Sequence, residues 1–182
     1  MSNFFVISGP SGVGKTTLTD VIKKENMDEI VHTISYTNRP KREGEVHGID
    51  YYFTDTPAFQ RKVLKDEFLA WDSVYGKLYG TDKQEVIDNM RRVGKTFVIF
   101  NDGGAKQVKE RGFPAIYIYL LPPNEEELQK RLLRRGLSNN LDIRMAVAKQ
   151  EMAKAHYYDH VIINRDFHES LEQLRKIMCL CG

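Results

Sequence analysis

The chain has 182 residues, which is enough for one domain with a sizeable core. Hydrophobic residues make up 41% of it, charged residues make up 29%, and the net charge is only +2, so neither a nucleic acid nor a membrane surface is indicated as a partner. The first residues run into a strand-like segment instead of a signal peptide, and no apolar run is long enough for a membrane span. We therefore expect a cytoplasmic protein in which Cys179 and Cys181 are reduced thiols.

Short apolar runs alternate with helical patterns along most of the chain. Nearly continuous apolar runs predict buried strands at residues 4–8, 31–35, 96–101, 115–121 and 160–164. The spacing of apolar residues and the capping boxes DKQE and NEEE predict helices at residues 15–25, 82–94, 104–111, 124–135, 141–156 and 167–178. This alternation predicts an α/β domain with right-handed crossovers.

Residues 36–79 interrupt the alternation. The segment contains the short aromatic pieces DYYF, EFLAW and KLYG around one helix that begins after Thr56-Pro57. Short aromatic strands close together favour a small antiparallel sheet over further parallel strands. The sequence therefore predicts an α/β core that carries a β-rich insert.

The stretch ISGPSGVGKTT, at residues 7–17, satisfies the P-loop pattern G-x-x-x-x-G-K-T between a predicted strand and a predicted helix. Its glycines let backbone N–H groups turn inward around phosphate oxygens, and the positive end of the following helix points to the same place. Lys15 is placed to reach the β- and γ-phosphates, and the Thr16 hydroxyl to bind Mg²⁺. The motif predicts a nucleoside triphosphate site.

Two groups of cationic side chains follow the P-loop along the chain, and we expect one group on each side of it. One group is Arg131, Arg134, Arg135 and Arg144, and the other combines Arg39, Lys41 and Arg42 with Tyr51. Two such groups predict two phosphorylated ligands, as a small kinase requires. A GTPase is disfavoured because Asp102-Gly103-Gly104 lacks the D-x-x-G spacing and no N-K-x-D occurs.

At this point the chain resembles the guanylate kinase family over nearly its whole length. The matching segments are GPSGVGKTT, S-x-T-x-R-x-x-R-x-G-E-x-x-G-x-D-Y at 35–51, LYGT at 78–81, K-R-L-x-x-R-G at 130–136, Arg144 and VIIN at 161–164. The resemblance implies one P-loop kinase domain over 1–182, with a five-stranded parallel sheet core flanked by helices. The core would comprise 1–35 and 80–182, the acceptor-binding insert 36–79, and a short lid 136–143.

The resemblance also implies roles for individual residues. Ser35, Arg39, Arg42, Tyr51 and Tyr79 would bind the acceptor's phosphate, and Thr81 would contact guanine. Arg131, Arg135 and Arg144 would bind the phosphoryl group in transfer, and Asn164 would lie near the adenine of ATP. The implied ATP site is Gly9, Pro10, Ser11, Gly12, Val13, Gly14, Lys15, Thr16, Thr17, Arg131 and Asn164, with Lys15, Arg42, Arg135 and Arg144 as the catalytic residues. The implied cofactor is Mg²⁺ bound with ATP.

The chain departs from the family at the guanine-binding end. Ala70 occupies the position of a family glutamate that accepts hydrogen bonds from guanine, and the first aspartate of the family's L-D-I-D segment has no counterpart in IFNDGGA. Asp72, on the same face of a regular strand as Ala70, is a candidate replacement, as is Asp102, or Asn101 in the other register. Asp72 and Asp102 therefore join the candidate acceptor-binding residues.

These departures leave alternatives for the function. The leading hypothesis is ATP-dependent phosphorylation of GMP or dGMP, by a monomer or homodimer. The first alternative is a ribose 1,5-bisphosphate kinase that forms phosphoribosyl diphosphate, which Ala70 and Asn101 favour. The alternative of another class is a non-catalytic guanylate-kinase-like binding module, which the intact Lys15, Thr16, Arg135 and Arg144 disfavour.

Overall fold

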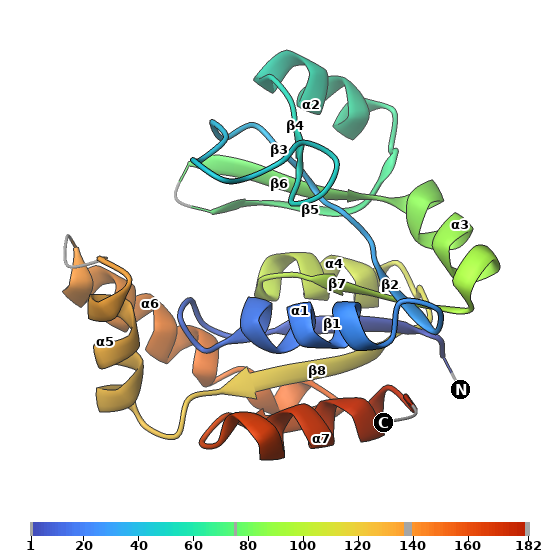
Figure 1. Ribbon diagram of the computed structural model, residues 1–182. Helices are drawn as coiled ribbons and strands as arrows, with labels where there is room; N and C mark the ends of the chain where they lie inside the picture. Colours follow the sequence, from blue (N-terminus) through green and yellow to red (C-terminus); the bar gives the residue numbers. More distant parts are fainter. Residues whose placement is uncertain (1, 75, 137–139, 181–182) are drawn as a thin grey trace.

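The computed structural model describes residues 2–74, 76–136 and 140–180. Its larger sheet has five parallel strands in the order β2-β7-β1-β8-β9 (Figure 1). The strands are β1 (Phe4–Ser8), β2 (Ile30–His32), β7 (Lys95–Ile99), β8 (Ile116–Leu121) and β9 (His160–Ile163). Each of the five predicted strands belongs to this sheet, so the predicted α/β class is confirmed.

Helices cover both faces of this sheet. The side chains of β1 alternate between the two faces: Phe5 and Ile7 join the cluster that includes α1 (Lys15–Glu25) and α7 (Phe167–Ile177), and Phe4 and Val6 join the other. The second cluster includes α3 (Lys83–Val93) and α4 (Asp102–Glu110). Each fully buried side chain of this kind stabilises the fold by about 1.5–3 kcal/mol, which fixes the strand that leads into the P-loop.

Two further helices lie at the end of the sheet where β1 leads into the P-loop (Figure 1). These helices, α5 (Glu125–Arg134) and α6 (Leu141–Met152), pack on each other through Leu128, Leu132 and Ala148. The predicted lid, residues 136–143, begins after α5 and ends in the first turn of α6. Residues 137–139 of this lid lie outside the described residues. No helix in the described ranges is long and apolar enough to cross a membrane.

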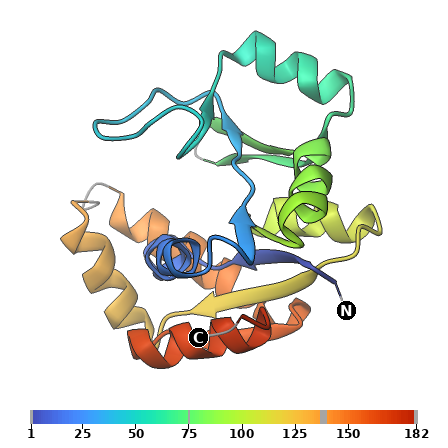
Figure 2. The ribbon, with the colours of Figure 1, turned by 45° about the vertical axis from the view of Figure 1, so that its right-hand side comes forward.

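The insert forms a second, four-stranded sheet in the order β4-β3-β6-β5 above the core (Figures 1 and 2). Its elements are β3 (Tyr36–Thr37), β4 (Tyr52–Phe53), α2 (Thr56–Leu64), β5 (Phe68–Val74) and β6 (Lys77–Asp82). The β3–β6 and β5–β6 pairs are antiparallel as expected, but β3 and β4 are parallel. A long connection, residues 38–51, joins these two strands and allows β4 to run in the same direction as β3. A tight hairpin would have made the pair antiparallel.

Several predicted boundaries differ from the structure. Strand β2 ends at His32, short of the predicted 31–35, because the chain leaves the core sheet there to reach the insert. Helix α4 begins two residues early because the Asn101 side chain caps it by accepting a hydrogen bond from Gly104 N. Helix α6 ends at Met152, and a separate 3₁₀ turn, Ala155–Tyr157, follows it.

Candidate functional site

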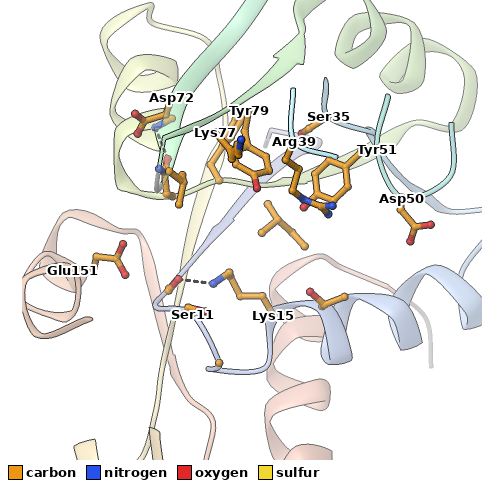
Figure 3. A pocket seen from close by; sticks show the side chains of 18 of the residues that line it. Ser11, Lys15, Ser35, Arg39, Asp50, Tyr51, Asp72, Lys77, Tyr79 and Glu151 are labelled. Atoms are coloured by element: carbon orange, nitrogen blue, oxygen red, sulfur yellow. Dashed lines mark hydrogen bonds between the residues drawn. The ribbon is translucent and has the colours of Figure 1, made fainter. Parts of the chain in front are cut away.

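A cavity of about 1080 Å³ lies between the P-loop (residues 9–16), the insert sheet and α6. Figure 3 shows Ser11 and Lys15 on one side of it, with Arg39, Tyr51 and Tyr79 of the insert on the other. The candidate residues that line it are Gly9, Ser11, Gly12, Gly14, Lys15, Thr16, Ser35, Arg39, Arg42, Tyr51, Asp72, Tyr79, Arg135 and Arg144. The fold thus brings most of the two predicted phosphate-binding groups to one place.

The P-loop backbone has conformations that favour glycine. Gly9 has a φ of 145° and Gly14 a φ of 107°, both in the region that L side chains rarely adopt. A Cβ on Gly9 would lie 2.4 Å from the carbonyl oxygen of Leu120 in β8, and one on Gly14 would lie 2.6 Å from Asn164 Nδ2. The glycines therefore let the loop pass directly over the ends of the neighbouring strands, with its N–H groups available to a phosphate.

Lys15 extends back along the P-loop to its backbone. Its ammonium group donates hydrogen bonds to the carbonyl oxygens of Gly9 and, at 3.0 Å, Pro10. Burial lowers the pKa of Lys15 from 10.5 to about 8, an effect that the nearby Glu151 carboxylate opposes and the Arg135 guanidinium reinforces. Because the ammonium group is poorly solvated, a phosphate anion that binds beside it would strongly stabilise its charged form.

On the insert side, a carboxylate holds the first arginine. Arg39 binds Glu45 through both terminal nitrogens, one of them at 2.7 Å, and its guanidinium carbon lies 5.0 Å from the centre of the Tyr51 ring. The same carboxylate accepts a hydrogen bond from Arg42 N at 2.8 Å. These hydrogen bonds, the one from Arg39 first, lower the pKa of Glu45 to about 2, so it is ionised at every pH of interest. Glu45 thus connects the two arginines that are candidates for the acceptor phosphate.

The rest of the acceptor side comes from β5 and β6. Tyr79 lies on the cavity wall with its ring centre 5.9 Å from that of Tyr51, and Asp72 is its register partner on β5. Ser35 reaches the cavity and exchanges a 2.8 Å hydrogen bond with the Thr81 hydroxyl, although Thr81 does not itself line the cavity. The hydroxyl groups of Ser35, Tyr51 and Tyr79 therefore lie beside the arginines on this wall, together with the carboxylate of Asp72.

The lid side contributes cations and one carboxylate. Arg135, which ends α5, and Arg144, in the first turns of α6, both line the cavity. Glu151 lines it as well, and burial, followed by the charge of Asp102, raises the pKa of its carboxyl group. Glu151 lies seven residues after Arg144, so both side chains occupy the same face of α6.

Arg131 and Asn164 lie behind the P-loop instead of in the cavity. Arg131 donates to Val13 O and Asn164 O, each at 3.2 Å, and forms an ion pair with Glu127 at 2.9 Å. The Asn164 amide donates to Val13 O at 2.8 Å. Both side chains therefore hold the loop in shape, and Arg131 also borders a second hollow of about 600 Å³ beside Asn124 and Arg165.

Four other candidates also lie outside the cavity lining. The carboxylate of Asp102 is directed to the Tyr158 hydroxyl at 3.1 Å and to Lys154 at 3.2 Å. Pro10 contributes a backbone carbonyl to Lys15, Val13 is buried in the core, and Thr17 is exposed in the first turn of α1.

Sequence reasoning missed several residues that the structure brings to the cavity. Among them are Glu45, which holds Arg39, and Glu151, Lys77, Asp50 and His32, which line the wall. Two of these could have been predicted from their spacing in the sequence. Glu45 follows Arg42 by three residues in a turn, and Glu151 follows Arg144 by seven residues, which places both on one face of a helix. His32 is neutral at physiological pH because burial lowers its pKa to about 4, and it stacks on Phe97 with ring centres 4.8 Å apart.

Comparisons with known proteins give a consistent result. The guanylate kinase family model matches residues 1–179. The chain is 37% identical over 175 residues to a guanylate kinase of Carboxydothermus hydrogenoformans, covering 95% of this chain and 85% of that protein. It is 38% identical over 176 residues to one of Syntrophomonas wolfei, covering 96% and 90%. The crystal structure of guanylate kinase from Anaplasma phagocytophilum is similar with a TM-score of 0.78 at 29% identity, covering 97% of this chain and 84% of that one.

Proposed function

The chain belongs to the guanylate kinase family and is a phosphotransferase of that family, and we propose that it transfers the γ-phosphoryl group of ATP to GMP or dGMP. The observation that carries the proposal is a single cavity with a phosphate-binding wall on each side, the P-loop on one and Arg39, Arg42, Tyr51 and Tyr79 on the other. Arg135 and Arg144 enter the same cavity from a third side. The comparisons do not favour the ribose 1,5-bisphosphate kinase or the binding module.

The arrangement supports transfer without a covalent enzyme intermediate. Lys15 and the P-loop N–H groups are proposed to bind the β- and γ-phosphates of ATP, while Arg39 and Arg42 orient the acceptor phosphate for in-line attack. Arg135 and Arg144 are then placed to neutralise charge on the transferring group, where a planar guanidinium matches phosphate oxygens. Positioning and charge neutralisation in a cavity from which water is excluded supply the catalysis.

The remaining candidates have supporting roles in this proposal. Arg131 and Asn164 act on ATP by fixing the carbonyl of Val13, with the second hollow beside Arg131 as the proposed adenine site. Ser35 is proposed to contact the acceptor's phosphate, and Thr81, whose hydroxyl is hydrogen-bonded to that of Ser35, to contact the guanine ring. Asp72 and Asp102 remain candidates for contacts with the acceptor, of which only Asp72 reaches the cavity.

The proposed cofactor is Mg²⁺ bound with ATP, which would neutralise phosphate charge. The oxygen donors present fit this ion: the Thr16 hydroxyl and the Glu151 carboxylate both line the cavity. Among the described residues no three His, Cys, Asp or Glu side chains are grouped for a metal. This fits an ion held mostly by the nucleotide's phosphates and water, as is usual for Mg²⁺. The further proposal is a cytoplasmic monomer or homodimer with these small-molecule partners and neither nucleic acid nor membrane.

The test is ADP release from ATP and Mg²⁺ with GMP, dGMP, AMP, UMP, CMP or ribose 1,5-bisphosphate offered separately. Turnover that depends on GMP, with a KM from about 1 μM to 1 mM, is expected. Turnover with ribose 1,5-bisphosphate and none with GMP would overturn the proposal. ATP hydrolysis that no acceptor accelerates would overturn the whole kinase assignment. Arg144→Met is the companion variant, and it should lose turnover without losing the fold.

A further inference from the structure

The insert sheet packs on the core through one of its edge strands. Strand β5 lies at one edge of the four-stranded sheet, and α4 of the core packs along it (Figure 1). Two apolar side chains of β5, Leu69 and Ala70, belong to the same buried cluster as Ala105 and Val108 of α4. This apolar contact brings the outward-facing backbone of β5 within reach of the polar side chains of the helix.

Gln107 of α4 pairs its side chain with the free edge of β5. Its Oε1 accepts a hydrogen bond from Trp71 N at 3.2 Å, and its Nε2 donates one to Trp71 O at 2.5 Å. A neighbouring antiparallel strand would bind the same two backbone groups, because both groups of such a residue point to the same side. The carboxamide of Gln107 therefore takes the place of a further strand at this one residue, and it satisfies two half-buried backbone groups that would otherwise lack a partner.

The residue that Gln107 holds belongs to a row that crosses the whole insert sheet. The members of this row, each the register partner of the next, are Trp71, Gly80, Tyr36 and Tyr52. The residues proposed to bind the acceptor phosphate adjoin the row: Tyr79 precedes Gly80, Tyr51 precedes Tyr52, and Arg39 follows Tyr36 by three residues. A shift of β5 relative to α4 would therefore be transmitted along the row to the acceptor side of the cavity.

Helix α4 is in turn fixed relative to the P-loop. It directly follows β7, which pairs with β1 from Phe4 to Ile7, and β1 leads into the P-loop at Gly9. Gln107 thus joins the two walls of the cavity through hydrogen-bonded strands on both sides, although it does not itself line the cavity.

We propose that Gln107 is a positioning residue for phosphoryl transfer, which sets the separation and angle between the acceptor wall and the P-loop by holding Trp71. The inference rests on the proposed function and goes beyond it, because it assigns part of the reaction geometry to a contact outside the cavity. Transfer requires the reacting atoms to lie about 3–3.5 Å apart in line, and a displacement of about 1 Å can cost about 100-fold in rate. The hydrogen bonds of one carboxamide can therefore affect the rate without touching either substrate.

The first test removes both hydrogen bonds and nearly preserves the volume of the side chain. Gln107→Leu should lower kcat with ATP and GMP by about 10- to 100-fold, whereas the KM values for both substrates should change by less than about threefold, because the groups proposed to bind them stay in place. The measurement is steady-state ADP release at a temperature at which thermal melting shows every variant fully folded. Gln84→Leu is the matched control: it makes the same substitution on α3, where the exposed amide donates to Asp88 of the same helix at 2.9 Å, and it should keep the wild-type kcat.

The second variant, Gln107→Glu, distinguishes positioning from general stability. An ionised carboxylate accepts from Trp71 N but cannot donate to Trp71 O, whereas a protonated carboxyl group can do both and has nearly the shape of the amide. Partial burial and the facing carbonyl oxygen should raise the pKa of this carboxyl group above its ordinary value of about 4.3. The ratio of the variant's kcat to that of the wild type should therefore rise about 3- to 10-fold as the pH is lowered from about 8 to about 5. For Gln107→Leu the same ratio should not change with pH.

The results that would overturn the inference differ from the result that would overturn the proposed function. If the wild type converts GMP and Gln107→Leu keeps a kcat within about threefold of it, Gln107 does not position the acceptor wall, and the proposed function stands. The same conclusion follows if Gln107→Leu raises only the KM for GMP, or if the Gln107→Glu ratio is equal at both pH values. If Gln107→Leu does not fold, the pH comparison with Gln107→Glu decides alone. If the wild type releases no ADP with GMP, the proposed function fails and the inference fails with it.

Discussion

The two walls of the cavity that we propose to bind phosphate are built in different ways. On the P-loop side the binding groups are mostly backbone, fixed by glycines with positive φ and by Lys15 bonded to the carbonyls of its own loop. On the insert side they are side chains, with Arg39 and Arg42 joined through Glu45. The P-loop glycines cannot be replaced without strain, whereas the insert wall depends on the chemistry of individual side chains. The departures from the family, Ala70 and the missing strand aspartate, lie in neither of these groups but at the expected guanine-binding end.

The largest effect should follow from breaking the P-loop side. Lys15→Met removes the cation that we propose to bind the β- and γ-phosphates, and we expect kcat to fall by about 10²- to 10³-fold, the loss typical for one preorganised electrostatic contact. The measurement is steady-state ADP release with saturating GMP. Lys106→Met is the control, because Lys106 is exposed on α4 and pairs with Glu110 at 3.5 Å. A kcat within threefold of wild type in Lys15→Met would contradict this prediction and show that the backbone N–H groups of the P-loop suffice without the Lys15 cation.

The corresponding variant on the insert side is Glu45→Gln. We expect its effect in the KM for GMP, whereas the effect of Lys15→Met is expected in kcat. The variant weakens the hydrogen bonds that hold the Arg39 guanidinium and the Arg42 backbone, so we expect the KM for GMP to rise by about tenfold, with the KM for ATP unchanged. Glu43→Gln is a matched control, since Glu43 is exposed two residues away. A fall in the KM for GMP would contradict the prediction, because it would mean that Glu45 competes with the acceptor phosphate for Arg39.

The two walls should also differ in pH dependence. With a pKa of about 8, Lys15 of the free enzyme is charged below pH 8 and loses its proton as the pH rises through that value. Measured as a function of ATP, kcat/KM should therefore fall about tenfold per pH unit above pH 8, while kcat stays level to higher pH because bound phosphates raise the pKa of Lys15. Glu45 has a pKa of about 2 and stays ionised over this pH range. It should therefore cause no fall in kcat/KM for GMP when this constant is measured at saturating ATP. A flat profile for ATP up to pH 9.5 would contradict this assignment.

The same contrast governs what could be predicted from the sequence. The P-loop, the five core strands and most helices follow from local patterns, since buried parallel strands are apolar throughout and caps lie within a few residues of what they cap. The parallel pairing of β3 and β4 does not, because it depends on the path of residues 38–51. The orientations of Asp102, Arg131 and Asn164 could not be predicted either, because each is set by a partner distant in the sequence: Tyr158 for Asp102, and Val13 for Arg131 and Asn164.

The smallest effect should come from the residues behind the P-loop. Its measurement distinguishes a hydrogen bond that fixes the shape of the P-loop from one that only stabilises the fold. Asn164→Ala removes the 2.8 Å hydrogen bond to Val13 O, but Arg131 still donates to the same oxygen at 3.2 Å. We expect a loss of about 1 kcal/mol in the free energy of unfolding and a rise of about threefold in the KM for ATP, with the KM for GMP unchanged. Asn89→Ala is the matched control, because Asn89 is equally buried and donates to Thr33 Oγ1 at 3.1 Å away from the P-loop. If urea unfolding shows the same loss in both variants and only Asn164→Ala shifts the KM for ATP, the hydrogen bond acts on the loop. An equal shift in both would mean that general destabilisation, not the shape of the P-loop, sets the affinity for ATP.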